Sequence, residues 1–140
     1  MKLVKKKSDE KKEALSKRGR SSRQKGASFE REIAKRFQER YGIEFVRTPQ
    51  SGGFAKNRAE SEGFKGDIVP VDKNTEVKVH VECKSQKTWA LPKWIDQAKG
   101  DCPEGKVPIV VFRRFGTPQI YVTLPLEGFF ALSEILEEKK

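Results

Sequence analysis

Residues 66–84 read GDIVPVDKNTEVKVHVECK and predict two β-strands joined by a turn. The first strand covers GDIVPV, and the turn covers Asp72 to Thr75, whose polar residues favour a chain reversal. Residues 76–84 then alternate between apolar and polar side chains, which is the pattern of a strand with one buried face. The apolar face carries Val77, Val79, Val81 and Cys83, and the polar face carries Lys78, His80, Glu82 and Lys84.

The same stretch contains a pattern that suggests chemistry: Asp67, 14 intervening residues, and then Glu82-Cys83-Lys84. The two-residue period places Glu82 and Lys84 side by side, with Cys83 in the core. If the two strands pair as a hairpin, Asp67 reaches the same end of that face. Carboxylate oxygens suit Mg²⁺ or Mn²⁺, and such an ion would polarise a phosphodiester and lower the pKa of a bound water. Lys84 would orient or activate that water, or hold the phosphate.

The stretch ASFEREIAKRFQERYG (residues 27–42) predicts a helix with Ser28 as its N-cap and Gly42 at its end. At 100° per residue, one arc of this helix is apolar and is expected to be buried. It is formed by Phe29, Ile33, Ala34, Phe37 and Tyr41. Glu30 falls inside the arc and Glu32 falls well outside it. A carboxylate on a buried stripe needs a partner, because an unpaired buried charge is very costly.

We expect Glu30 to point at the group formed by Asp67, Glu82 and Lys84. The result would be three carboxylates and one ammonium around a single point. Without a metal ion the carboxylates would repel one another, so at least one pKa should rise. The pattern from Asp67 to Lys84 is short and common, and an ordinary solvated strand face is the alternative interpretation.

The rest of the chain divides into short elements of alternating type. Further strands are predicted at residues 43–49, 106–114 and 119–125, further helices at 91–100 and 126–140, and a long surface loop at 50–66. The predicted order is α-β-β-β-α-β-β-α, a mixed sheet with helices against it. Side chains of the last helix are expected to pack onto the sheet or onto a second subunit, namely Phe129, Phe130, Ile135 and Leu136.

Length and composition exclude several classes of protein. The 140 residues are the size of one domain, and the longest apolar runs are far too short for a membrane span. No early apolar stretch resembles a secretory signal. Two cysteines, Cys83 and Cys102, are too few for a disulfide scaffold. We therefore expect no membrane segment and a reduced, cytoplasmic compartment.

The net charge of +10 is concentrated at the N-terminus. Residues 1–25 hold 11 Lys or Arg and 3 Asp or Glu, whereas residues 26–140 hold 19 and 17. A cationic arm attracts nucleic acid by Coulomb attraction and counterion release, and Arg23 and Lys25 are candidate DNA contacts. The arm is poor in apolar residues, so we expect disorder there and a folded domain at 26–140. A solubility tail is the alternative.

Four motifs in series resemble the PD-(D/E)xK nuclease superfamily, and within it the archaeal-type Holliday junction resolvases, which phages also encode. They are KGASFEREIAKRF (25–37), RTPQSGG (47–53), GDIV (66–69) and VECKSQK (81–87), with a weaker match at WIDQA (94–98). The resemblance implies a nuclease domain at 26–140 with a restriction-endonuclease-like α/β core, a central mixed five-stranded β-sheet flanked by helices. It also implies Mg²⁺-dependent hydrolysis of DNA, with Mn²⁺ as a substitute, by a homodimer that makes paired nicks in four-way junctions.

The resemblance also suggests roles for individual residues. Glu30, Asp67 and Glu82 match the metal-binding carboxylates, and Lys84 matches the catalytic lysine. Four further positions match residues that the family uses near the active site or the DNA: Ser51, Arg31, Arg47 and Gln97. Two departures stand out. The residue before Asp67 is Gly66 and not proline, a mild change because proline is often absent there in the family. The 25-residue arm is longer than the family's usual start.

Two other functions remain open on this evidence. One is a different nuclease of the same superfamily, of the restriction or DNA-repair type, which would share the catalytic residues. The other is a basic DNA-binding module without catalysis, although a carboxylate on an apolar arc argues against it. His80, Trp89 and Trp94 have no assigned role. His80 is interpreted as a strand residue beside the site, and the two tryptophans as core or interface residues.

Overall fold

The computed structural model describes residues 23–48 and 66–137 of the chain. The described elements are a helix over residues 23–41, β1 (Phe45–Arg47), β2 (Ile68–Pro70), β3 (Val79–Gln86), α3 (Leu91–Asp101), β4 (Val107–Arg114), β5 (Tyr121–Thr123) and α4 (Leu126–Glu137). Their order confirms the predicted succession of helices and strands. Most of the predicted basic arm and most of the predicted loop, including Ser51, lie outside the described residues.

Helix 23–41 ends as predicted but begins earlier. Gly42 has a φ of 71°, a conformation that glycine adopts readily, and its N–H donates to the carbonyl of Gln38 at 2.9 Å. Ser28 lies inside the helix, so its prediction as the N-cap is wrong. Arg23 and Lys25 are good helix formers, which lets the helix continue on the N-terminal side of Ser28.

The five predicted strands are present, but they form two sheets and not one central five-stranded sheet. β1 pairs antiparallel with β2, while β3 pairs parallel with β4 and β4 pairs antiparallel with β5. β2 and β3 therefore do not form the hairpin that the sequence suggested as one way to bring Asp67 beside Glu82. β2 is only three residues long and ends at Pro70, which has no N–H for a ladder bond. A backbone hydrogen bond from Asp67 N to Val81 O, 2.8 Å long, connects the start of β2 to β3.

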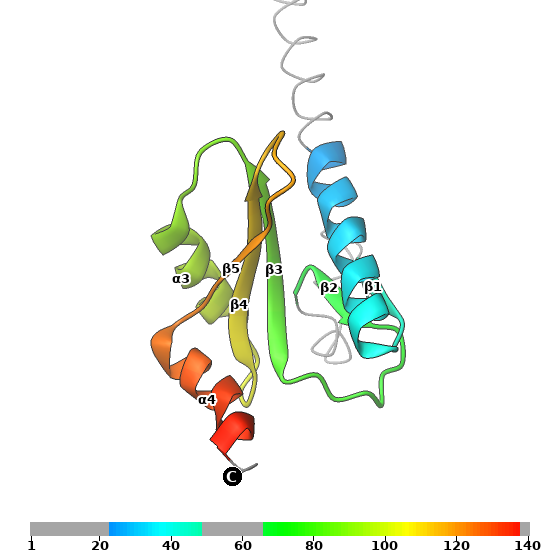
Figure 1. Ribbon diagram of the computed structural model, residues 1–140, viewed down its shortest axis with the longest axis vertical. Coiled ribbons are helices and arrows are strands. Elements are labelled where there is room, and N and C mark those ends of the chain that lie inside the picture. Colours follow the sequence, from blue (N-terminus) through cyan, green and yellow to red (C-terminus); the bar gives the residue numbers. More distant parts are fainter. Residues whose placement is uncertain (1–22, 49–65, 138–140) are drawn as a thin grey trace, which may run out of the picture.

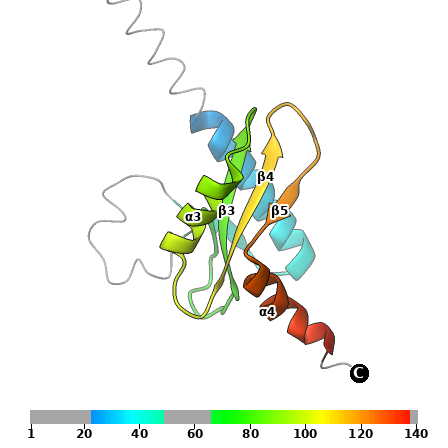
Figure 2. The ribbon, with the colours of Figure 1, turned by 90° about the vertical axis from the view of Figure 1, so that its left-hand side faces the viewer.

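Helices cover both faces of the three-stranded sheet. Helix 23–41 packs on one face through Phe29 and Ile33, which contact a core that includes Val81 and Val111. On the other face α3 packs through Trp94 and Ala98 against Val110 and Phe112. Figure 1 shows β3 and β4 between helix 23–41 and α3, and Figure 2 shows α3 in front of these strands with helix 23–41 behind.

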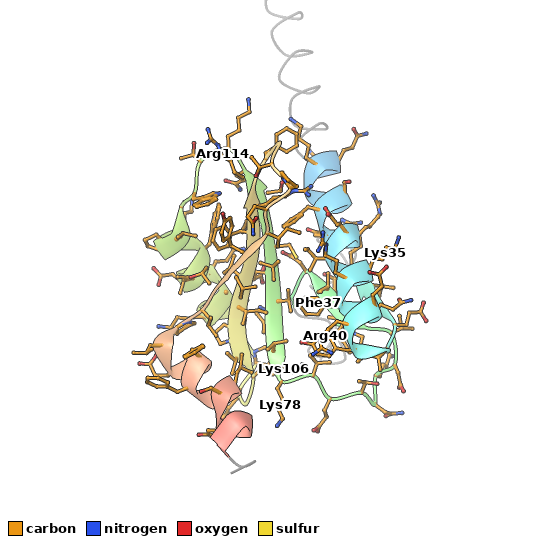
Figure 3. The ribbon with its side chains drawn as sticks, in the orientation of Figure 1. Lys35, Phe37, Arg40, Lys78, Lys106 and Arg114 are labelled. Atoms are coloured by element: carbon orange, nitrogen blue, oxygen red, sulfur yellow. The ribbon has the colours of Figure 1, made fainter. Side chains whose placement is uncertain are left out.

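Burial along helix 23–41 follows the predicted arc except at its last residue. Phe29, Ile33 and Ala34 are buried, and Phe37 packs against the same core. Figure 3 shows Phe37 on the side of the strands and Lys35 on the opposite side. Tyr41 is 63% exposed, so its predicted burial is wrong. It is the final helical residue before Gly42, and its ring lies against Phe37 with the centroids 5.9 Å apart.

The alternation of β3 is confirmed, and its polar face is covered as well. Val81 and Cys83 are buried in the core, as predicted. On the opposite face His80 is 2% exposed and Glu82 is 6% exposed, so the alternative of a solvated strand face does not describe these two residues.

α4 approaches the sheet through a glycine and leaves its aromatic residues outside. A Cβ built on Gly128 would lie 2.6 Å from Val107 Cγ1, so the helix packs against β4 at this point. Phe129 and Phe130 turn away from this contact and are more than half exposed. Of the two predicted alternatives, packing onto the sheet is therefore excluded for these two residues, and packing onto a second subunit stays a prediction. The side chains of Ile135 and Leu136, predicted with them, lie outside the part of the chain that the structure describes. Among the described residues, no helix is both long and apolar enough to cross a membrane.

Candidate active site

An open cavity of about 500 Å³ brings together most of the residues that the sequence singled out. Its walls include Glu30 from helix 23–41, Asp67 at the start of β2, Glu82 and Lys84 from β3, and Gln97 from α3. The rim adds Lys25, Gly26, Ser85, Gln86, Lys87 and Phe115. In Figure 3 this end of the sheet is marked by Arg114, which pairs with Gln86, while Lys78 and Lys106 lie at the opposite end.

The backbone holds Asp67 in place between the two sheets. Its N–H donates to Val81 O, its carbonyl accepts a hydrogen bond from Thr48 N at 2.9 Å, and its Oδ2 accepts one from Cys83 N at 2.6 Å. Gly66 precedes it with a φ of 100°. Proline is restricted to φ near −65°, so it could not adopt the conformation that Gly66 has here.

Burial and neighbouring negative charge raise the pKa of two carboxyl groups in the cavity, those of Asp67 and Glu30. Burial, followed by the charge of Glu82, raises the pKa of Asp67 to about 8, although the hydrogen bond from Cys83 opposes the change. Burial also raises the pKa of Glu30, against the lowering effect of Arg47. The Cys83 thiol has a pKa well above its usual value, because it is buried and close to Asp67. The predicted rise in pKa within the cluster is therefore present.

Glu30 has the partner that its position on the buried stripe requires. Arg47 Nε donates to Glu30 Oε2 at 2.9 Å, and the Glu30 side chain is only 7% exposed. The pair joins helix 23–41 to β1. Arg47 was expected near DNA, and in this structure one edge of its guanidinium faces Glu30.

The three carboxylates share the cavity but do not form the predicted three-ligand cluster. Within residues 23–48 and 66–137, no group of three or more His, Cys, Asp or Glu side chains is arranged to hold a metal ion. Glu30 is directed to Arg47, and Glu82 Oε1 lies 3.0 Å from His80 Nε2. Asp67 and Glu82 are nevertheless close enough to hydrogen-bond and to repel each other.

This donor set fits a magnesium-type ion in its chemistry. Mg²⁺ is commonly bound through one or two carboxylates, with waters and substrate phosphates as the other ligands. Half-buried Asp67 and buried Glu82 supply such a pair, and a divalent cation bound there would offset their repulsion.

Lys84 and Gln97 form the exposed side of the cavity. Lys84 Nζ donates to Gln97 Oε1 at 3.1 Å. α3 is fixed to the sheet by Trp94 and Ala98, which flank Gln97 in sequence and are both buried. The structure thus brings Gln97 to the predicted site beside Lys84.

The candidate DNA contacts are divided between two surfaces. Lys25 lies on the cavity rim, with its ammonium 4.3 Å from the centroid of Phe115. Arg31 does not line this cavity; it lines a separate hollow with Lys35 and Arg47. Arg23 is exposed near the start of the described chain.

Sequence reasoning did not assign His80 and Arg113 to the site or its support. The position of His80 two residues before Glu82 was the available signal, because strand neighbours of this kind share a face. Arg113 donates to Glu32 Oε2 at 2.6 Å and to Ser85 Oγ at 3.3 Å, so it ties helix 23–41 to the end of β3. No local pattern signals a contact across 81 residues.

The metal-free protein is expected to lose stability as the pH rises from about 5 to 8. The folded-state pKa of Asp67 is about 8, against an ordinary value of 3.8, so between these values the folded chain holds a proton that the unfolded chain has released. Raising the pH then favours unfolding. Above about pH 8 the folded chain has also released the Asp67 proton, and the stabilisation that this proton gives is lost. Each pKa unit between the folded and the unfolded value of this carboxyl group corresponds to about 1.4 kcal/mol of unfolding free energy. We expect a loss of at least about 1 kcal/mol.

Urea unfolding in EDTA at pH 5, 6.5 and 8 measures this effect. Asp67→Asn is the control, because it keeps an acceptor for Cys83 N and cannot ionise. As the pH rises, the unaltered chain should lose unfolding free energy relative to Asp67→Asn. A difference that stays constant with pH would contradict the raised pKa.

Comparison with known proteins adds one finding. Residues 21–140 match the family described as "Phage putative PDDEXK endonuclease". No curated protein matches the chain, and no solved structure matches it. The match covers all the residues that line the cavity.

Proposed function

We propose, since this chain belongs to the phage PDDEXK endonuclease family, that it is a metal-dependent endodeoxyribonuclease that resolves four-way DNA junctions by paired nicks. Membership places the chain in the PD-(D/E)xK nuclease superfamily, whose members are generally dependent on divalent metal ions. The observation that carries the proposal is the pair of half-buried Asp67 and buried Glu82 beside Lys84 in an open cavity. The preference for junctions rests on the resemblance of the motifs at 25–37, 47–53 and 81–87 to archaeal-type resolvases.

In this proposal each residue of the cavity has a distinct task. Asp67 and Glu82 would hold Mg²⁺, or Mn²⁺ in its place, and the bound ion would supply Lewis-acid activation of a phosphodiester and of water. Lys84 would orient or activate the attacking water, or hold the scissile phosphate. Gln97 accepts a hydrogen bond from Lys84 and so restricts the position of the ammonium. Arg47 offsets the negative charge of Glu30 beside the pair.

The rim of the cavity suits a nucleic-acid strand. Lys25 and Lys87 place two positive charges beside the carboxylates, and Phe115 offers a half-buried aromatic ring between the strand ends. Cations at this position would hold phosphates on either side of the scissile bond. Residues 1–22, with nine Lys or Arg and three Asp or Glu, would extend the positive surface.

A homodimer would match the substrate. A four-way junction has two equivalent phosphodiesters related by a two-fold axis, and a symmetric dimer would present two cavities to them. The exposed apolar side chains of β5 and α4 support self-association. They are Tyr121, Val122, Leu126, Phe129 and Phe130.

Cleavage of a synthetic four-way junction tests the proposal against its alternatives. The junction is compared with a linear duplex carrying the same sequences, in Mg²⁺ and in EDTA. We expect paired nicks in the junction with Mg²⁺, little cutting of the duplex, and none in EDTA. Equal cutting of both substrates would favour another nuclease of the superfamily. Binding without cutting in Mg²⁺ or Mn²⁺ would favour the non-catalytic DNA-binding module.

A further inference from the structure

His80 lies directly behind the carboxylate pair and is almost completely enclosed. Its side chain is 1% exposed, and its Nε2 is 3.0 Å from Glu82 Oε1. The two residues are neighbours on the same face of β3. Within the described residues, its Nδ1 is buried and has no hydrogen-bond partner.

The contacts of the ring define which nitrogen carries the proton. A buried N–H without a partner costs more than a buried bare nitrogen lone pair, because the strong donor loses its water and gains nothing. The arrangement with the fewest losses places a proton on Nε2, which donates to Glu82 Oε1. Glu82 then receives a directed hydrogen bond on one oxygen, which leaves its other oxygen for the cavity.

The same ring also supports the segment that carries Asp67. A Cβ built on Gly66 would lie 3.3 Å from His80 Nδ1 and 3.1 Å from Val81 O, so the backbone at Gly66 rests closely on the imidazole. Asp67 follows directly and bonds to Val81 O. One side chain therefore contacts Glu82 on one side and, on the other, lies so near the backbone before Asp67 that a Cβ at Gly66 would crowd it.

We propose that His80 is a positioning residue, which orients the Glu82 carboxylate and sets its separation from Asp67 so that the two can hold a divalent cation together. The inference rests on the proposed metal-dependent function. It assigns His80 no contact with DNA or with the reacting atoms. Residues that hold metal ligands through hydrogen bonds typically change metal affinity by about 10- to 100-fold when they are replaced.

Two substitutions separate the hydrogen bond from the packing. His80→Leu fills the space with an apolar group and removes the donor to Glu82. His80→Gln places an amide nitrogen near the position of Nε2 and so retains a donor. Ile109→Val is the matched control, because it weakens the core on the opposite face of the same sheet without touching the cavity.

Binding of Mn²⁺ to each full-length protein, in the absence of DNA, is measured by the loss of the free-ion EPR signal. Thermal unfolding under the same conditions gives the folded fraction. We expect His80→Leu to bind Mn²⁺ about 10- to 100-fold more weakly per folded molecule. His80→Gln should recover most of this loss, and Ile109→Val should bind as the unaltered chain does.

Two results would overturn the inference while leaving the proposed function intact. One is equal Mn²⁺ affinity for His80→Leu and the unaltered chain. The other is an affinity loss shared by His80→Leu, His80→Gln and Ile109→Val, which would reflect a general loosening of the fold. If the unaltered chain bound no Mn²⁺ and cut no DNA, the proposed function and this inference would fall together.

A second measurement needs neither metal nor activity. His80 is the single histidine of the chain, so its imidazole nitrogen signals in a ¹⁵N NMR spectrum need no assignment. In EDTA we expect the spectrum to show a proton on Nε2, as the hydrogen bond to Glu82 requires. A proton on Nδ1 with a bare Nε2 would contradict the hydrogen bond that the inference requires.

Discussion

Replacing Asp67 with Asn, or Glu82 with Gln, is expected to lower the rate of DNA cleavage by about 10³-fold or more while DNA binding survives. A metal ion contributes several kcal/mol to charge stabilisation in the transition state, and about 1.4 kcal/mol corresponds to a factor of ten in rate. Either change removes one anionic oxygen from the pair of carboxylates that Asp67 and Glu82 contribute to the cavity. Both variants keep the shape of the natural side chain.

The local structure makes Asp67→Asn an especially clean substitution. The amide oxygen of Asn can accept the hydrogen bond that Cys83 N donates to Asp67 Oδ2, so the backbone at the start of β2 is retained. Loss of the buried charge also removes its repulsion with Glu82. We therefore expect the variant to be at least as stable as the unaltered chain at pH 8.

Single-turnover cleavage in Mg²⁺ and junction binding in EDTA measure the two quantities separately. Glu39→Gln is the matched control, since Glu39 is exposed on helix 23–41 and does not line the cavity. It removes one negative charge and should leave both quantities within a factor of two or so of their natural values. Full cleavage activity in either Asp67→Asn or Glu82→Gln would refute the proposed roles.

Replacing Lys84 with Met is expected to reduce cleavage at saturating DNA by about 10²- to 10⁴-fold, the usual contribution of a positioned acid or base. The Met side chain keeps most of the aliphatic stem and removes the ammonium that donates to Gln97. Because Lys84 is one of several cations near the cavity, DNA affinity should fall much less than the rate.

Three comparisons make the Lys84 experiment specific. Lys93→Met removes an exposed lysine from α3 that does not line the cavity, and its cleavage rate should stay near that of the unaltered chain. Lys84→Arg should not restore the rate, because a guanidinium differs from an ammonium in geometry and stays protonated. Gln97→Ala keeps the ammonium and should cost less than Lys84→Met. If Lys84→Met cut DNA at the rate of Lys93→Met, the ammonium would have no part in the reaction.

Much of the fold follows from local patterns, and these patterns have physical causes. The two-residue alternation of β3 predicted which side chains enter the core, because successive side chains of a strand point to opposite faces. The helical arc predicted the burial of Phe29, Ile33 and Glu30 for the same kind of reason. The need of Glu30 for a partner followed from the cost of an unpaired buried charge, and Arg47 meets it.

Other features depend on contacts that no local pattern reports. Alternation identifies two faces of β3 but not what covers them, so the burial of His80 and Glu82 depends on the rest of the fold. The division into two sheets depends on the end of β2 at Pro70 and on the path of residues 71–78, which connect β2 to β3. The outward position of Phe129 and Phe130 follows from the close approach of α4 to β4 at Gly128.

The order of the elements, the apolar face of each one and the acidic and basic residues of the candidate site were already determined by the sequence. Only the tertiary structure decided which of these groups touch: Glu30 with Arg47, Glu82 with His80, and Lys84 with Gln97. The reason is physical. Periodicity depends on a residue and its near neighbours, whereas contacts between elements depend on the path of the whole backbone between them.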